Sequence, residues 1–69
     1  MDNKIREYRV LMGMSQAELA DACGVSRETI CRIERKNSNP SLGLALRIAA
    51  GLNASVEELF VSDREAILQ

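Results

Sequence analysis

The sequence predicts an all-α fold in which five short helices form a single domain over residues 1–69. Apolar residues recur at helical spacing in five successive stretches, and a serine directly precedes four of them. Glycine, asparagine or proline separates each stretch from the next. The composition, with 46% apolar and 28% charged residues, is typical of a globular chain.

The first two helices are marked by their ends. We expect the first helix over about residues 4–12, with its end at Gly13. Its apolar stripe consists of Ile5, Tyr8 and Met12, and both Met12 and Met14 are expected in the core. The second helix opens with Ser15-Gln16-Ala17-Glu18, a capping box whose two polar side chains satisfy each other's backbone N–H groups, and it ends at Gly24.

The third helix follows a turn of three residues, Gly24-Val25-Ser26, and is expected to continue to about Arg35. Gly24 can adopt a positive φ at the end of the preceding helix, and Ala20 is small where the two helices cross. The residues expected between the helices are Leu19, Val25, Ile30 and Ile33. Two capped helices joined by such a turn form a helix-turn-helix motif.

Two further helices follow a polar loop at residues 36–40, where Pro40 keeps Asn39 out of helical geometry. The fourth helix is expected over about residues 41–52 as the central element. Its apolar side, expected in the core, consists of Leu42, Ala45, Leu46, Ala49 and Leu52. A second capping box, Ser55-Val56-Glu57-Glu58, opens a short fifth helix that reaches Phe60. The remaining residues, 61–69, are compatible with a helix, an edge strand or a frayed end.

The third helix separates two kinds of side chain. At 100° per residue its inner side consists of Thr29, Ile30 and Ile33, and its outer side of Arg27, Glu28, Cys31, Arg32 and Arg35. A charged outer side is common on any surface helix, but the capped helix and turn before it favour a recognition helix. The net charge of −1 argues mildly against a nucleic-acid partner. The charge is unevenly distributed, however, because residues 27–36 carry a local +2 and residues 37–69 a local −2.

The composition excludes several classes of function. Histidine is absent, which removes the usual general base and the commonest zinc ligand, so we expect no metal site and no cofactor. Two aromatic residues are too few to stack a single-stranded nucleic acid. Cys23 and Cys31 are expected as reduced thiols of a cytoplasmic protein, Cys23 in the core and Cys31 on the outer side of the third helix. No apolar run is long enough to span a membrane, and no small-molecule ligand is indicated.

Four stretches carry a resemblance to a known family. They are Ser15-Gln16-Ala17-Glu18-Leu19-Ala20, Gly24-Val25-Ser26, Thr29-Ile30-x-Arg32-Ile33-Glu34 and Ser38-Asn39-Pro40-Ser41-Leu42. Together they resemble the Cro/phage-repressor-like helix-turn-helix family, also called the XRE family, over about residues 4–61. The resemblance implies a lambda-repressor-like domain that binds double-stranded DNA, with its third helix in the major groove and usually as a twofold dimer on a palindromic operator.

The resemblance also implies roles for individual residues. The base-contacting positions fall on Arg27, Glu28 and Arg32, with Thr29 at a thymine methyl or a phosphate. The phosphate-contacting positions fall on Gln16, Ser26, Arg35, Lys36, Asn37, Ser38, Asn39 and Ser41. Arg9 and Glu34 match a family pair that forms a structural salt bridge between the first and third helices. Lys36 replaces the family's usual glycine, so the left-handed turn is expected to move to Asn37 or to cost strain.

Two functional interpretations remain at this point. The first is a sequence-specific transcriptional regulator, a homodimeric repressor whose tail at residues 62–69 contributes to dimerisation. The expected dimer residues are Val56, Phe60, Val61, Ile67 and Leu68. The alternative is an antitoxin-like or accessory regulator whose main partner is another protein bound through the C-terminal segment. An enzyme is not expected, because the paired carboxylates lie on exposed helix faces with no cleft implied.

Overall fold

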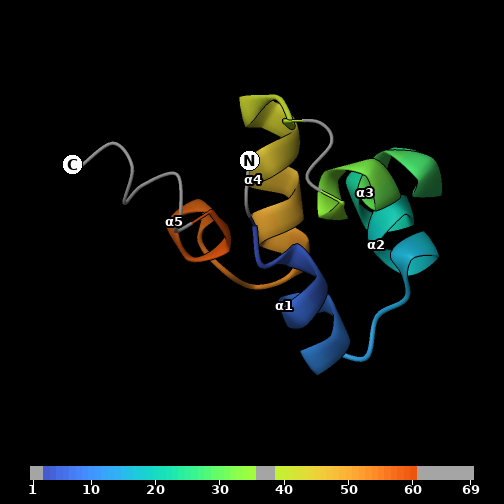
Figure 1. Cartoon of the computed structure of the whole chain (residues 1–69), viewed down its shortest axis with the longest axis horizontal. Coiled ribbons are helices and arrows are strands. Elements are labelled where there is room, and N and C mark those ends of the chain that lie inside the picture. Colours follow the sequence, from blue (N-terminus) through green and yellow to red (C-terminus); the bar gives the residue numbers. More distant parts are fainter. Residues whose placement is uncertain (1–2, 36–38, 61–69) are drawn as a thin grey trace.

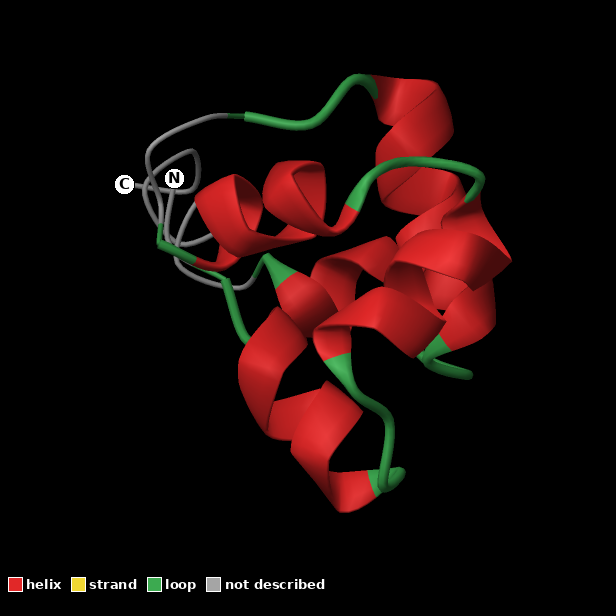
Figure 2. Cartoon of the chain, turned by 90° about the vertical axis from the view of Figure 1, so that its right-hand side faces the viewer, coloured by secondary structure: helices red, strands yellow, loops and turns green. Residues whose placement is uncertain are grey.

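The computed structural model describes residues 3–35 and 39–60, and these residues form five α-helices and no strand. The helices are α1 (Ile5–Leu11), α2 (Gln16–Cys23), α3 (Arg27–Glu34), α4 (Leu42–Gly51) and α5 (Val56–Leu59). Helix α4 lies at the centre, with α2 and α3 on one side of it and α5 on the other (Figure 1). Figure 2 shows the same helices from the side of α2 and α3. The predicted all-α, five-helix fold is confirmed.

Both predicted capping boxes are present. The backbone N–H of Glu18 donates to Ser15 Oγ at 3.0 Å, and the Ser15 N–H donates to Glu18 Oε1 at 2.9 Å. The second box repeats the same pair of bonds between Ser55 and Glu58 at 2.9 and 3.0 Å. In both glutamates these hydrogen bonds to the charged carboxylate lower the pKa of the side chain. The predicted starts of these two helices are confirmed. Each start depends only on bonds made within four residues, which is why the sequence could predict it.

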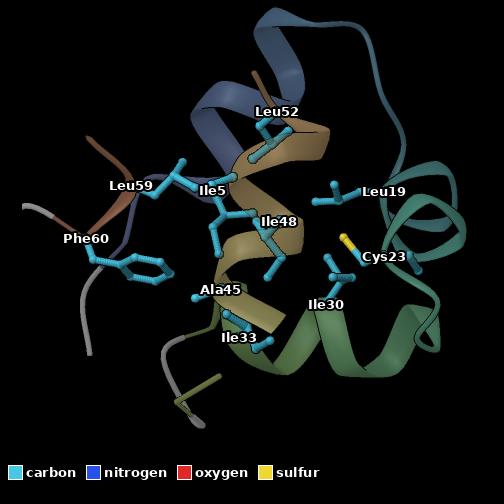
Figure 3. Packing of buried hydrophobic residues seen from close by; sticks show 12 residues of the cluster. Ile5, Leu19, Cys23, Ile30, Ile33, Ala45, Ile48, Leu52, Leu59 and Phe60 are labelled. Carbon is cyan, nitrogen blue, oxygen red and sulfur yellow. The ribbon is translucent and has the colours of Figure 1, made fainter. Parts of the chain in front are cut away.

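The core gathers apolar side chains from every helix (Figure 3). The buried residues are Ile5, Leu19, Ala20, Cys23, Ile30, Ile33, Ala45, Ile48, Ala49, Leu52, Leu59 and Phe60. The expectation that Cys23 belongs to the core is confirmed. Burial raises the pKa of its thiol, although the nearby Arg47 cation opposes this.

The predicted apolar sides of two helices were partly wrong. Leu42 and Leu46 of α4 are 73% and 54% exposed, and the buried row of α4 runs instead through Ala45, Ile48, Ala49 and Leu52. Met12, expected in the core, is 49% exposed at the end of α1, whereas Met14 is half-buried against the core. Small residues let α4 approach its neighbours closely, since a Cβ on Gly51 would lie 3.3 Å from Leu19 Cδ1. Those neighbours therefore select the row that is buried.

Three turns in the described part of the chain have a left-handed backbone, at Gly13 (φ +69°), Gly24 and Asn53. Gly24 has φ +71° at the end of α2, as the turn between the two motif helices requires. Asn53, after α4, has φ +53°, which asparagine tolerates better than most residues. No helix in the described part of the chain has the length and apolar character needed to cross a bilayer.

Candidate nucleic-acid interface

Helix α3 divides sharply into an inner and an outer side. Ile30 and Ile33 are fully buried and hold the helix against the core (Figure 3). Arg27, Glu28 and Arg32 are exposed on the opposite side. These residues, together with Cys31 and Arg35, line a shallow hollow of about 400 Å³ that runs along the outer surface of the helix. The three residues expected to contact bases therefore lie together on one exposed surface.

The start of α3 is fixed by hydroxyl groups. Ser26 Oγ accepts a hydrogen bond from the Thr29 N–H at 3.2 Å, and the two hydroxyl oxygens lie 3.0 Å apart. Thr29 is half-buried, so its side chain lies at the edge of the exposed surface formed by its neighbours on α3. Ser26 itself is exposed and serves as the N-cap of the helix.

A largely buried ion pair connects α3 to α1. Arg9 Nε donates to Glu34 Oε2 at 2.7 Å, and its second terminal nitrogen donates to Glu34 Oε1 at 3.3 Å. The other terminal nitrogen of Arg9, Nη1, donates to the Met14 carbonyl at 2.8 Å. The two charged side chains are 12% and 6% exposed. The contact is bidentate, which constrains the angle between α1 and α3 as well as the distance between them.

Gln16 joins this pair to the outer surface of α3. Its Nε2 donates to Glu34 Oε1 at 3.1 Å, and its Oε1 accepts from Arg27 at 3.2 Å. A chain of hydrogen bonds thus runs from Arg9 through Glu34 and Gln16 to Arg27. The resemblance suggested a phosphate contact for Gln16 but did not indicate that it would also orient a base-contacting arginine.

Two other long-range bonds had no signal in the sequence. Asn3 Nδ2 donates to the Ile33 carbonyl at 2.8 Å, which ties the chain before α1 to the end of α3. Arg47 of α4 donates to the Cys23 carbonyl at 3.4 Å near the end of α2. Both satisfy carbonyl groups close to helix ends, where internal partners are missing.

The remaining predicted site residues are less concentrated. Asn39 and Ser41 are exposed, and Ser41 Oγ also accepts from the Leu44 N–H at 3.2 Å as the N-cap of α4. Lys36, Asn37 and Ser38 lie outside the described residues, as does the turn expected at Asn37.

The structure describes only some of the expected dimer residues. Phe60 is 7% exposed and fills the core of its own chain, so it has little surface to offer a second copy. Val56 is half-buried against that core. Val61, Ile67 and Leu68 lie outside the described residues.

A helix-turn-helix whose second helix and C-cap expose three arginines, and whose second helix is held by part-buried bonds, defines a DNA-binding domain of a transcriptional regulator. A family model described as helix-turn-helix (HTH_3) matches residues 5–59, and the chain belongs to this family. It is an XRE-type, DNA-binding transcriptional regulator and not an enzyme.

Similar proteins include regulators from archaea and bacteria. An uncharacterized HTH-type transcriptional regulator from Archaeoglobus fulgidus is 49% identical over 67 residues, which cover 97% of this chain and 96% of the relative. Among solved structures, the restriction-modification controller protein C.AhdI from Aeromonas hydrophila has a TM-score of 0.78 and 37% identity, covering 83% of this chain and 86% of that one. SinR, the master regulator for biofilm formation, in complex with DNA, has a TM-score of 0.73 and 36% identity over 78% of this chain and 87% of the SinR chain in that structure.

Proposed function

We propose that the protein is a homodimeric repressor that binds a palindromic operator in double-stranded DNA and reads it with α3. The observation that carries this proposal is the outer side of α3, where Arg27, Glu28 and Arg32 lie exposed while Ile30 and Ile33 are buried beneath them. A helix held this firmly presents its side chains to the major groove with little loss of conformational entropy on binding.

The chemistry of the exposed residues indicates which bases they read. Arginine donates two hydrogen bonds to guanine O6 and N7, and glutamate accepts one from cytosine N4. Arg27 and Arg32 therefore favour guanine, and Glu28 favours cytosine, so each half-site contains at least one G·C pair. Thr29, at the edge of this surface, is suited to a thymine methyl or a phosphate.

Contacts to phosphates fix the helix in the groove. Ser26 and Arg35 cap the two ends of α3, Gln16 is bonded to Arg27, and Asn39 and Ser41 are exposed at the start of α4. Lys36, Asn37 and Ser38 complete the proposed set of phosphate contacts. Support for DNA binding by this fold comes from the likeness to SinR, which has been solved in complex with DNA.

The need to select one DNA sequence favours a dimer. One recognition helix reads too few base pairs to select one site against a genome of competing sequence, and a second copy related by twofold symmetry squares that selectivity. The proposed contact involves Val56 together with Val61, Ile67 and Leu68.

Selection of bound duplexes from a random pool tests the proposal. We expect an inverted repeat whose half-sites are separated by about one helical turn. In gel-shift titrations, Arg27→Ala is expected to relax the preference for the selected sequence, while Arg35→Ala weakens binding to all duplexes equally. A selected site without symmetry would refute the dimer, and an unchanged sequence preference in Arg27→Ala would refute the role of α3.

A further inference from the structure

A second hollow, of about 380 Å³, lies beside the one along α3 and contains residues from three helices. Arg6 and Arg9 contribute from α1, Gln16 from α2, Arg27, Cys31 and Glu34 from α3, and Arg35 from the C-cap of α3. Arg6 has no role in the salt bridge, the caps or the core, and it is exposed. The hollow thus brings Arg6 of the first helix to the same surface as Arg27 of α3 and Arg35 at its C-cap.

The hollow is strongly positive. Its lining includes four arginines and one glutamate, which leaves a net charge of +3. Glu34 is already bonded by Arg9 and Gln16, so its charge is compensated inside the protein. Arg6, Arg27 and Arg35 form no salt bridge with any other described residue. Three guanidinium groups that share one concave surface attract an oxyanion more strongly than the same charges spread over a convex surface.

We propose that this hollow binds a phosphodiester group of the DNA backbone and that Arg6 of α1 is one of its ligands. The proposal rests on DNA binding through α3 and extends that interface to the first helix. Arginine suits the role because its planar fork donates two parallel hydrogen bonds to phosphate oxygens.

Gln16 has a place in the same site. Its amide nitrogen carries two hydrogens, of which one is directed at Glu34. The second remains available to a phosphate oxygen at the surface. The same side chain can therefore hold Arg27 in position and contact the backbone of the duplex.

The position of the hollow favours a duplex over a free anion. Arg27, Cys31 and Arg35 line both this hollow and the one along the outer surface of α3, so the two are adjacent. A duplex whose bases lie against Arg27 and Arg32 carries its sugar-phosphate backbone across the neighbouring surface. Inorganic phosphate has the same oxyanion chemistry, but it is too small to gain contacts in the hollow along α3 as well.

The test compares Arg6→Gln with a matched control, Lys4→Gln. Both substitutions remove one positive charge from an exposed position at the start of the chain, but Lys4 does not line the hollow. Dissociation constants for a mixed-sequence duplex are measured by fluorescence anisotropy over a series of salt concentrations. Each phosphate contact contributes a slope of about 0.9 to the plot of log affinity against log salt.

We expect Arg6→Gln to lower this slope by about 0.9 and to weaken binding roughly tenfold at low salt, with the same effect on every duplex sequence. Lys4→Gln is expected to change the slope by less than a third as much, and Arg6→Lys to restore most of it. Equal slopes for Arg6→Gln and Lys4→Gln would overturn the inference while leaving DNA binding intact. Absence of duplex binding by the unsubstituted protein would instead refute the proposed function itself.

A second measurement separates the two sources of phosphate. Inorganic phosphate is titrated into the DNA-free protein at constant ionic strength, and the arginine Nε–H signals are followed by NMR. We expect no saturable shift. Saturation that disappears in Arg6→Gln, together with an unchanged salt slope on DNA, would identify the hollow as a free-anion site and overturn the assignment to the duplex.

Discussion

Removing Glu34 is expected to destabilise the fold more than any change to an exposed charge on the same helix. In Glu34→Ala, the Arg9 guanidinium stays buried but loses both of its bonds to the carboxylate, and the Gln16 amide loses one. A buried charge left without its partner costs about 3 kcal/mol. For a chain of this length the whole free energy of unfolding is only about 3 to 10 kcal/mol, so the substitution removes a large fraction of it.

Urea unfolding followed by circular dichroism measures this loss. We expect the free energy of unfolding to fall by about 3 kcal/mol and the Tm by roughly 12–24 °C. Glu28→Ala removes an exposed glutamate from the same helix and is expected to cost less than about 0.5 kcal/mol. The double variant Arg9→Met/Glu34→Met leaves no buried charge and is expected to recover much of the loss. If Glu34→Ala and Glu28→Ala unfolded at the same urea concentration, the structural role of the ion pair would be refuted.

Three further predictions concern thiols, acid stability and glycines. A thiol reagent is expected to modify the half-buried Cys31 before Cys23, whose pKa is raised by burial; bound duplex should slow the first phase, and two phases of equal rate would contradict this. Because the capping-box bonds lower the pKa of Glu58 below its usual 4.5, its contribution to stability is present above that pH and is lost as the pH falls through the lowered value. Glu58→Gln should therefore flatten the acid limb of a stability–pH curve measured by urea unfolding. Gly24→Ala is expected to destabilise by about 1 kcal/mol because φ is +71°, whereas Gly43→Ala inside α4 is expected to stabilise by up to about 1 kcal/mol in the same assay. Stabilisation by Gly24→Ala would contradict the first glycine prediction, and destabilisation by Gly43→Ala would contradict the second.

The helix starts could be predicted from the sequence because their causes are local. Ser15 and Glu18 satisfy each other within one helical turn, and Ser55 and Glu58 repeat the arrangement. The same holds for Gly24, since an αL backbone after a helix favours a residue without a Cβ. Nothing distant in the chain has to be known for these features.

The rotation of α4 could not be predicted in the same way. Leu42 and Leu46 form as good an apolar row with Ala45 and Ala49 as Ile48 does, and hydrophobicity alone favours the leucines. The neighbouring helices decide between the two rows, and they bury Ile48 fully. Met12 was misplaced for a related reason, because α1 ends at Leu11 and the chain turns away before that side chain reaches the core.

The candidate site was predictable as a set of side chains on one helix but not as a network. Periodicity placed Arg27, Glu28 and Arg32 on the outer side of α3, where the structure has them. The bond from Gln16 to Glu34 spans 18 residues, and the hollow that includes Arg6 depends on how α1 crosses α3. Periodicity within one helix carries no information about such crossings.

The charge distribution shows most clearly what the folded structure adds to the information in the sequence. The net charge of −1 suggests a weak attraction to DNA, and even residues 27–36 count only +2 because Glu28 and Glu34 offset four cations. In the structure Glu34 is bonded to Arg9, while Arg6 joins the surface from a helix some twenty residues earlier. The resulting hollow carries +3 beside the recognition helix, although the chain as a whole is slightly acidic. Since salt screens charges beyond about 8–10 Å, a duplex against α3 responds to this local cluster more than to the total.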